Sequence, residues 1–75
     1  MKDVGKEIML EFLESYFTNE KIKIDTSQVQ YLKVMDYEML LCDEFKVLHI
    51  KDNEYISIHY NGSMLPVAVK QLSNS

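Results

Sequence analysis

The sequence predicts an α+β fold in which one N-terminal amphipathic helix packs on a four- to five-stranded antiparallel meander sheet, either open or curled into a small barrel. Two observations predict it. The first residues have a helical apolar period, and the chain from Glu38 to Val69 reads as alternating runs joined by two-residue turns. The turns are Asp43-Glu44, Asp52-Asn53 and Asn61-Gly62. Asn-Gly between alternating runs is the strongest short hairpin signal, because a type I′ turn needs positive φ at both central positions.

The helix is expected over residues 3–18. Its apolar side chains recur every three or four residues and form one stripe: Val4, Ile8, Met9, Phe12, Leu13, Tyr16 and Phe17. Asp3 is a suitable N-cap, and Asn19 can adopt the left-handed conformation that ends a helix.

Strands are expected at residues 21–24, 29–35, 38–42, 45–51, 54–60 and 64–69. The stretch 29–37 is ambiguous, since Leu32, Met35 and Met39 would also fit a helix; its β-branched residues and tyrosines favour a strand. Residues 71–75 form a polar tail that we expect to fray. The whole chain, residues 1–75, is expected to be one domain.

The turns predict the pairing of the strands. A two-residue turn at Asn61-Gly62 pairs Ile58 with Leu65 and Ile56 with Val67, which also puts Val69 on that face. Pro66 would then lie on the opposite face, across from Ser57. Because proline cannot donate to a ladder, the last strand is predicted to be an edge or to be bulged there.

The earlier turns extend the same face. Asp52-Asn53 pairs Phe45 with Tyr60, Val47 with Ile58 and His49 with Ile56, and Asp43-Glu44 adds Leu40 and Cys42. In this register His49 sits across from Glu38.

The opposite face of the predicted sheet is also largely apolar. It holds Tyr37, Met39, Leu41, Leu48, Ile50 and Tyr55. One helix can cover only one face, and a sheet with a solvated face should alternate more cleanly. The sheet therefore closes into a barrel, packs on a second copy or binds a protein partner, and these six residues are the candidate partner-binding site.

Composition narrows the class of protein. The chain has 75 residues, a single cysteine and a net charge of −4, and all its basic side chains are lysines. A single cysteine cannot form a disulfide within the chain, and small domains without disulfides often gain stability by association. We expect no metal, no cofactor and no membrane span, and a cytoplasmic location. Acidity without arginine disfavours nucleic-acid binding without excluding it.

No catalytic constellation is visible, so we expect a protein that is not an enzyme. The Glu38–His49 pair lacks a nucleophile and a third partner, and a histidine bonded within the sheet is the expected outcome. His59 belongs to the other face and is expected to be exposed or at an interface. Cys42 lies beside Asp43-Glu44, which raises a thiol pKa and makes a poor nucleophile.

The favoured function is a small non-catalytic protein-interaction module, a regulator or inhibitor of accessory, immunity or phage type, that docks through an apolar sheet face or an edge strand. Two alternatives stay open. A helix followed by about five short strands resembles the architecture of Sm-like barrels, which implies RNA binding; the glycine turn and basic motif of that family are not seen here. The acidic charge could also mimic nucleic acid to block a nucleic-acid-binding protein.

Overall fold

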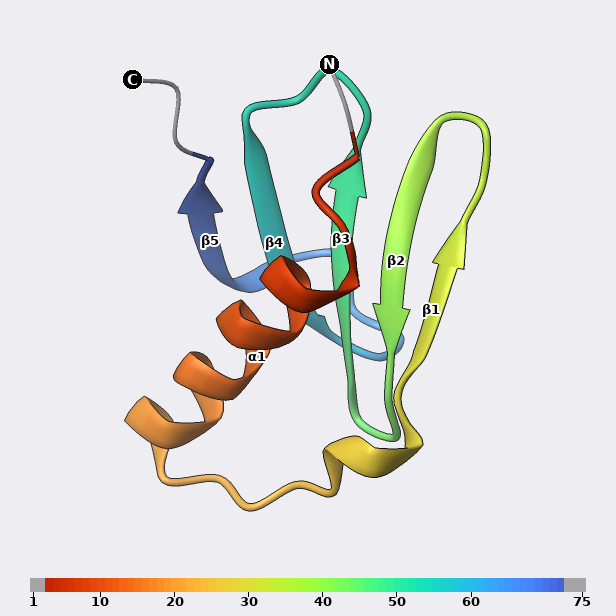
Figure 1. Cartoon of the computed structure of the whole chain (residues 1–75). Helices are drawn as coiled ribbons and strands as arrows, with labels where there is room; N and C mark the ends of the chain where they lie inside the picture. The colour runs from red at the N-terminus through yellow and green to blue at the C-terminus, as the bar shows by residue number, and fades with distance from the viewer. Residues whose placement is uncertain (1–2, 73–75) are drawn as a thin grey trace.

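The computed structural model describes residues 3–72, which form one α-helix packed on one face of an open five-stranded antiparallel sheet (Figure 1). The elements are α1 (Lys6–Glu20), the 3₁₀ turn η1 (Thr26–Gln28), β1 (Gln30–Lys33), β2 (Tyr37–Leu41), β3 (Phe45–Ile50), β4 (Tyr55–Tyr60) and β5 (Pro66–Gln71). The strands follow one another in space in the order of the chain, so β1 and β5 are the two edges. The predicted α+β meander is confirmed, and its barrel variant is wrong.

Both ends of the helix differ from the prediction. Gly5, not Asp3, is the N-cap, with φ 96° and ψ 159°, and the helix runs to Glu20. Lys21, not Asn19, adopts the left-handed conformation that ends it, with φ 58°. The Ile22 amide then donates to the Phe17 carbonyl at 2.9 Å, which satisfies one of the free carbonyls of the last turn.

The core lies between α1 and the sheet. Its buried members are Met9, Leu13, Phe17, Leu40, Phe45, Val47 and Ile58. The rings of Phe17 and Phe45 meet edge to face, with centroids 4.9 Å apart. This edge-on contact is the arrangement that aromatic quadrupoles prefer, so it orients the helix on the strands as well as burying area.

The segment between α1 and β1 is not a strand. Residues 22–25 belong to no strand, and the side chains of Ile22 and Ile24 pack against the core as partly buried residues. The prediction of a strand at 21–24 is therefore wrong. The alternation arises because Ile22 and Ile24 pack against the core while the lysines that alternate with them stay exposed. The ambiguous stretch is a strand over Gln30–Lys33, followed by a turn that the Val34 amide closes on the Tyr37 carbonyl at 2.9 Å.

The registers predicted from the first two turns are confirmed. Phe45 lies opposite Tyr60 and Val47 opposite Ile58, while Leu40 faces Val47 across the preceding hairpin. Side chains at these positions all point towards α1.

The predicted register of the last strand is wrong by three residues. Ile58 faces Ala68 instead of Leu65, and Ser57 faces Val69, so Val69 lies on the face away from α1. A tight turn does form, since the Ser63 amide donates to the Tyr60 carbonyl at 3.0 Å, but Gly62 has a positive φ and Asn61 does not, so it is not the expected type I′ turn. The chain leaves the ladder after it, and β5 begins at Pro66.

Pro66 is the residue at which the chain rejoins the sheet. A strand begins readily at a proline, which has no N–H to give to the ladder. Pro66 lies opposite His59, and the register shifts between Ile58 and His59. The prediction was that the last strand is an edge or is bulged at Pro66; β5 is an edge, and its register irregularity lies beside Pro66. Of the predicted frayed tail, Gln71 belongs to β5 and the Leu72 amide donates to the Glu54 carbonyl at 2.6 Å; residues 73–75 lie outside the described residues.

Candidate interaction face

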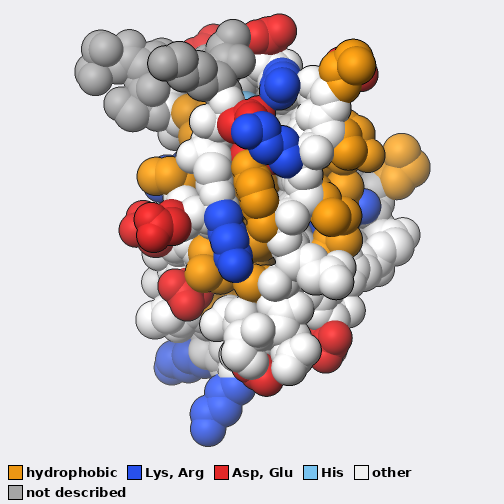
Figure 2. All heavy atoms as spheres, turned by 45° about the vertical axis from the view of Figure 1, so that its right-hand side comes forward, with side chains coloured by type: hydrophobic (Ala, Val, Ile, Leu, Met, Phe, Trp, Pro, Cys, Tyr) orange, Lys and Arg blue, Asp and Glu red, His pale blue; other side chains and the backbone are white. Residues whose placement is uncertain are grey.

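The face of the sheet turned away from α1, here called the distal face, carries all six predicted candidate residues. The ladder of β2 and β3 places Tyr37 opposite Ile50 and Met39 opposite Leu48. Leu32 of β1 and Val69 of β5 extend this face towards the two edges. In Figure 2, hydrophobic side chains run down the right-hand side of the molecule, which is turned away from α1.

The distal face is accessible. Ile50 is 50% exposed, Tyr55 48% and Val69 53%, whereas Leu41 and Leu48 are half-buried by their neighbours. Among the strand residues that point to this face, only Lys46 carries a full charge. Such an apolar surface on a small domain is typical of an interaction site.

One end of the distal face is hollowed. A shallow depression of about 290 Å³ lies between β3, β4 and β5. It is lined by Leu48, Ile50, Asn53, Tyr55, Ser57 and Val69.

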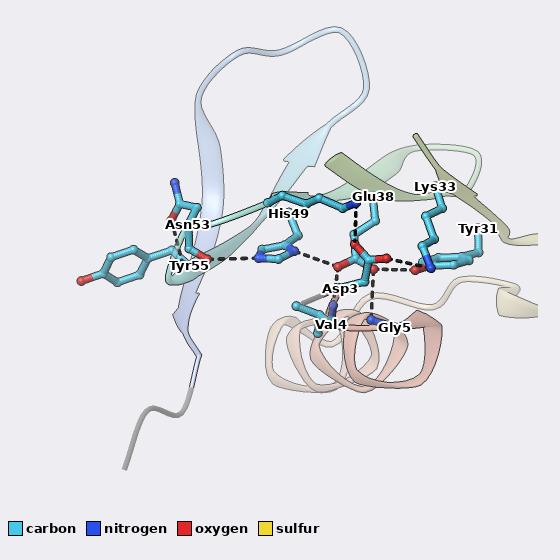
Figure 3. A network of polar contacts seen from close by, with 10 residues as sticks. Asp3, Val4, Gly5, Tyr31, Lys33, Glu38, His49, Asn53 and Tyr55 are labelled. Atoms are coloured by element: carbon cyan, nitrogen blue, oxygen red, sulfur yellow. Dashed lines mark hydrogen bonds and ion pairs between the residues drawn. The ribbon is translucent and has the colours of Figure 1, made fainter. Parts of the chain in front are cut away.

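The other end of the same face is raised. The connection from β4 to β5, residues 61–65, stands out on the side of the sheet opposite α1, as Figure 3 shows. Met64 is 93% exposed and Leu65 77%. Asn61 fixes the base of this connection, because its side-chain amide donates to the carbonyls of Cys42 and Asp43 at 2.8 Å each.

His59 lies on the distal face, as predicted, but it is buried rather than exposed, with 8% of its surface accessible. Its Nε2 is 2.8 Å from Ser57 Oγ, and its Nδ1 has no hydrogen-bond partner among residues 3–72. Within these residues no third group orients the ring, as the base of an activated serine would require.

A second group of polar residues is buried between the N-terminus of α1 and the sheet (Figure 3). Glu38 of β2 has no exposed surface, and its two carboxylate oxygens accept four hydrogen bonds. The donors are the amides of Val4 and Gly5, the Tyr31 hydroxyl at 2.5 Å and His49 Nδ1 at 2.7 Å. Glu38 thus supplies from the sheet the cap that the helix sequence lacks.

These contacts set the protonation of the cluster. Burial raises the pKa of Glu38, but the hydrogen bonds from Tyr31, Val4, Gly5 and His49 outweigh it and hold the pKa below its ordinary value of 4.5. Burial and the neighbouring Glu38 carboxylate raise the pKa of Tyr31 to about 12. The carboxyl group is therefore ionised and the phenol neutral at pH 7.

Asp3 forms ion pairs with two lysines beside the Glu38 cluster. Its Oδ2 is 2.7 Å from Lys33 Nζ, and its Oδ1 is 3.9 Å from Lys51 Nζ. The hydrogen bond from Lys33 lowers the pKa of the Asp3 carboxyl group. This ion pair explains why Asp3 is drawn to the sheet and does not cap α1.

Sequence reasoning found the Glu38–His49 pair but missed the rest of this cluster. Tyr31 and the Val4 and Gly5 amides reach Glu38 only through the packing of α1 on the sheet. On the distal face it missed Val69, which it assigned to the other side. The register shift beside Pro66 inserts one residue between the His59–Pro66 and Ile58–Ala68 pairs, and this moves Val69 to the distal face.

Cys42 behaves as predicted from its neighbours. The thiol is partly buried, and its Sγ is 3.5 Å from the Phe45 carbonyl. Burial raises the pKa of this thiol, and the charges of Asp43 and Glu44 add to the effect. It is a poor nucleophile at neutral pH.

Comparison with protein families, curated proteins and solved structures finds no match for this chain. Within residues 3–72, no helix has the length and apolar character needed to cross a membrane. The same residues hold no group of three or more His, Cys, Asp or Glu side chains placed to bind a metal ion.

Proposed function

We propose that this chain is a small non-catalytic interaction module that docks a protein through the distal face and thereby regulates or inhibits it. The single observation that carries the proposal is the exposed apolar surface formed by β2, β3 and β4 opposite the face that α1 covers. A domain of this size has little apolar surface to spare, so an uncovered sheet face of this kind is a strong candidate for an interface.

The size of the face limits the affinity. Five strands about 4.8 Å apart and about five residues long give a footprint on the order of 400 Å² per partner. At roughly 25 cal/mol per Å², complete burial of an apolar surface of that size contributes about 10 kcal/mol from each side. Association costs about 4–15 kcal/mol, so a moderate affinity is expected and a few central side chains should dominate it.

Leu41 and Leu48 are the central side chains to test. Both point to the distal face and both are held by their neighbours as half-buried residues, so contact with a partner restricts their side chains at low entropic cost. The edge strand β5 is a second docking route, by addition of a partner strand, but its bulge beside Pro66 interrupts the regular ladder that such pairing needs.

The RNA-binding alternative loses its architectural basis, because the sheet is open and the likeness was to a closed barrel. No observation favours the nucleic-acid mimic over the docking module. The unpaired, partly buried Cys42 fits a reducing cytoplasm, which is where we place the activity.

The test is the double variant Leu41→Ala/Leu48→Ala, with Ile8→Ala on the exposed side of α1 as the matched control. Circular dichroism first confirms that both variants are folded. Native mass by light scattering and quantitative capture of protein partners are then compared with the wild type. We expect the double variant to lose association and the control to retain it. Unchanged mass and unchanged capture in the double variant would contradict the proposal.

A further inference from the structure

We propose that the occupant of the distal face is a second copy of this chain, related by a two-fold axis that exchanges the ends of the strands. Each copy then places its Met64–Leu65 tip in the depression of the other. This inference rests on one part of the proposed function, the use of the distal face to dock a protein, and it names a second copy as the protein that occupies the face.

The tip and the depression lie at opposite ends of one face. Leu65 immediately precedes Pro66, which pairs with His59 near the end of β4, whereas Tyr55 at the beginning of β4 lines the depression. The six residues of β4 span on the order of 17 Å. A copy therefore cannot fill its own depression, but a two-fold axis across the strands brings each tip over the partner's depression in two equal contacts.

The two features also match in chemistry. The tip presents two almost fully exposed aliphatic side chains, and the depression is lined mainly by aliphatic and aromatic ones, including Leu48, Ile50 and Val69. A depression of about 290 Å³ accommodates a side chain of the size of leucine or methionine. Methionine is well suited to such a contact because its flexible side chain adapts to an irregular surface.

Lys46 favours the same arrangement. It is the charged strand residue of the distal face, and it lies in the central strand β3 at the end near the tip. Exchange of the ends places the two Lys46 side chains at opposite ends of the interface, while an axis parallel to the strands would bring them together.

The area fits a weak dimer. Two footprints on the order of 400 Å², with the two tips added, bury about 1,000 Å² in total, which is the lower limit for a specific interface. A concentration-dependent dimer with a dissociation constant in the micromolar range is expected.

Sedimentation over a concentration series tests the proposal. We expect a monomer–dimer equilibrium for the wild type and at least a tenfold weaker one for Met64→Ser/Leu65→Ser, whose side chains are exposed in the monomer. Ile8→Ser, on the side of α1, should match the wild type. A wild type that remains monomeric at about 100 times the expected dissociation constant overturns the proposal, as does an unchanged equilibrium in the double variant.

Disulfide trapping tests the geometry. In a Cys42→Ser background, Leu65→Cys and Val69→Cys cannot bridge within one chain, since four extended residues separate them by about 13 Å and a disulfide needs Cα atoms within about 7 Å. Oxidation should give a closed dimer with two disulfides. A ladder of longer polymers would overturn the two-fold arrangement. If the wild type is monomeric but loses a different protein partner on Leu41→Ala/Leu48→Ala, only the second copy is overturned and the proposed function stands.

Discussion

Glu38 and His49 face each other across β2 and β3 with Oε2 and Nδ1 2.7 Å apart, and neither side chain has exposed surface. His49 Nε2 lies 3.1 Å from the Asn53 carbonyl, so both ring nitrogens face oxygen acceptors. The pair joins the start of α1 to the hairpin of β3 and β4, and loss of either partner leaves a buried polar group without compensation.

Replacement of Glu38 should therefore lower stability in a pH-dependent way. Glu38→Gln puts an amide donor beside the Val4 and Gly5 amides and removes the negative charge, and we expect a loss of about 3 kcal/mol at pH 7. Folding lowers the pKa of Glu38 from its ordinary value of 4.5. The contribution of Glu38 to the unfolding free energy is therefore complete above pH 4.5, and it is lost as the pH falls through the pKa of the folded protein. The difference between wild type and variant in urea unfolding should therefore shrink below pH 4.5.

Glu11→Gln is the control for this experiment. Glu11 is exposed on α1, so the unfolding free energies of the wild type and of Glu11→Gln should differ little at every pH tested. A gap between wild type and Glu38→Gln that stays constant down to pH 3 would show that the carboxylate charge is not the source of the stability.

Tyr31→Phe removes one donor and leaves the remainder of the cluster in place. A hydrogen bond to a charged group contributes about 1.5–3 kcal/mol, so we expect a loss near the lower end of that range with the fold retained. Folding raises the pKa of Tyr31 to about 12 from 10.0, so its contribution is complete below pH 10 and is lost as the pH rises towards 12.

Absorbance of tyrosinate measures this directly. The wild type should show a late ionisation step near pH 12 that Tyr31→Phe lacks, and Tyr37→Phe on the distal face should keep it. Persistence of the step in Tyr31→Phe would assign it to another tyrosine and contradict the prediction.

Gly5 is the backbone position where a side chain should be most costly. Its φ of 96° and ψ of 159° belong to a region that L-residues almost never occupy, and no heavy atom lies within 4 Å of the position that a Cβ would take. Gly5→Ala should therefore cost on the order of 1–3 kcal/mol from the backbone alone. Chemical synthesis with D-alanine at position 5 is the control, because a positive φ suits a D-residue. Equal unfolding free energies for the L- and D-alanine proteins would exclude backbone conformation as the cause.

The site was predictable wherever the chain alone fixes geometry over a few residues. The turns Asp43-Glu44 and Asp52-Asn53 set the register of three strands, and that register placed Tyr37, Met39, Leu48 and Ile50 on one face and His49 opposite Glu38. Side chains alternate with a period of two, so once a turn is right every following position is assigned to its face.

The last strand shows where that reasoning stops. The Asn61-Gly62 turn forms, yet the chain continues outward through Met64 and Leu65 before Pro66 opens the strand. A turn motif fixes only its own four residues, and whether the next ones rejoin the ladder depends on contacts with the rest of the sheet. The three-residue difference moved Val69 to the distal face.

By itself, therefore, the sequence determined the N-terminal helix, the pairing of β2, β3 and β4, and the presence of two apolar faces, because these follow from periodicity and turn chemistry. Tertiary structure alone decided that the sheet stays open and that Glu38 caps α1 from another element. It also decided that a raised tip and a depression share the distal face. Those features depend on side chains and amides far apart in the chain, which come together only when α1 and the 61–65 connection take their places on opposite sides of the sheet.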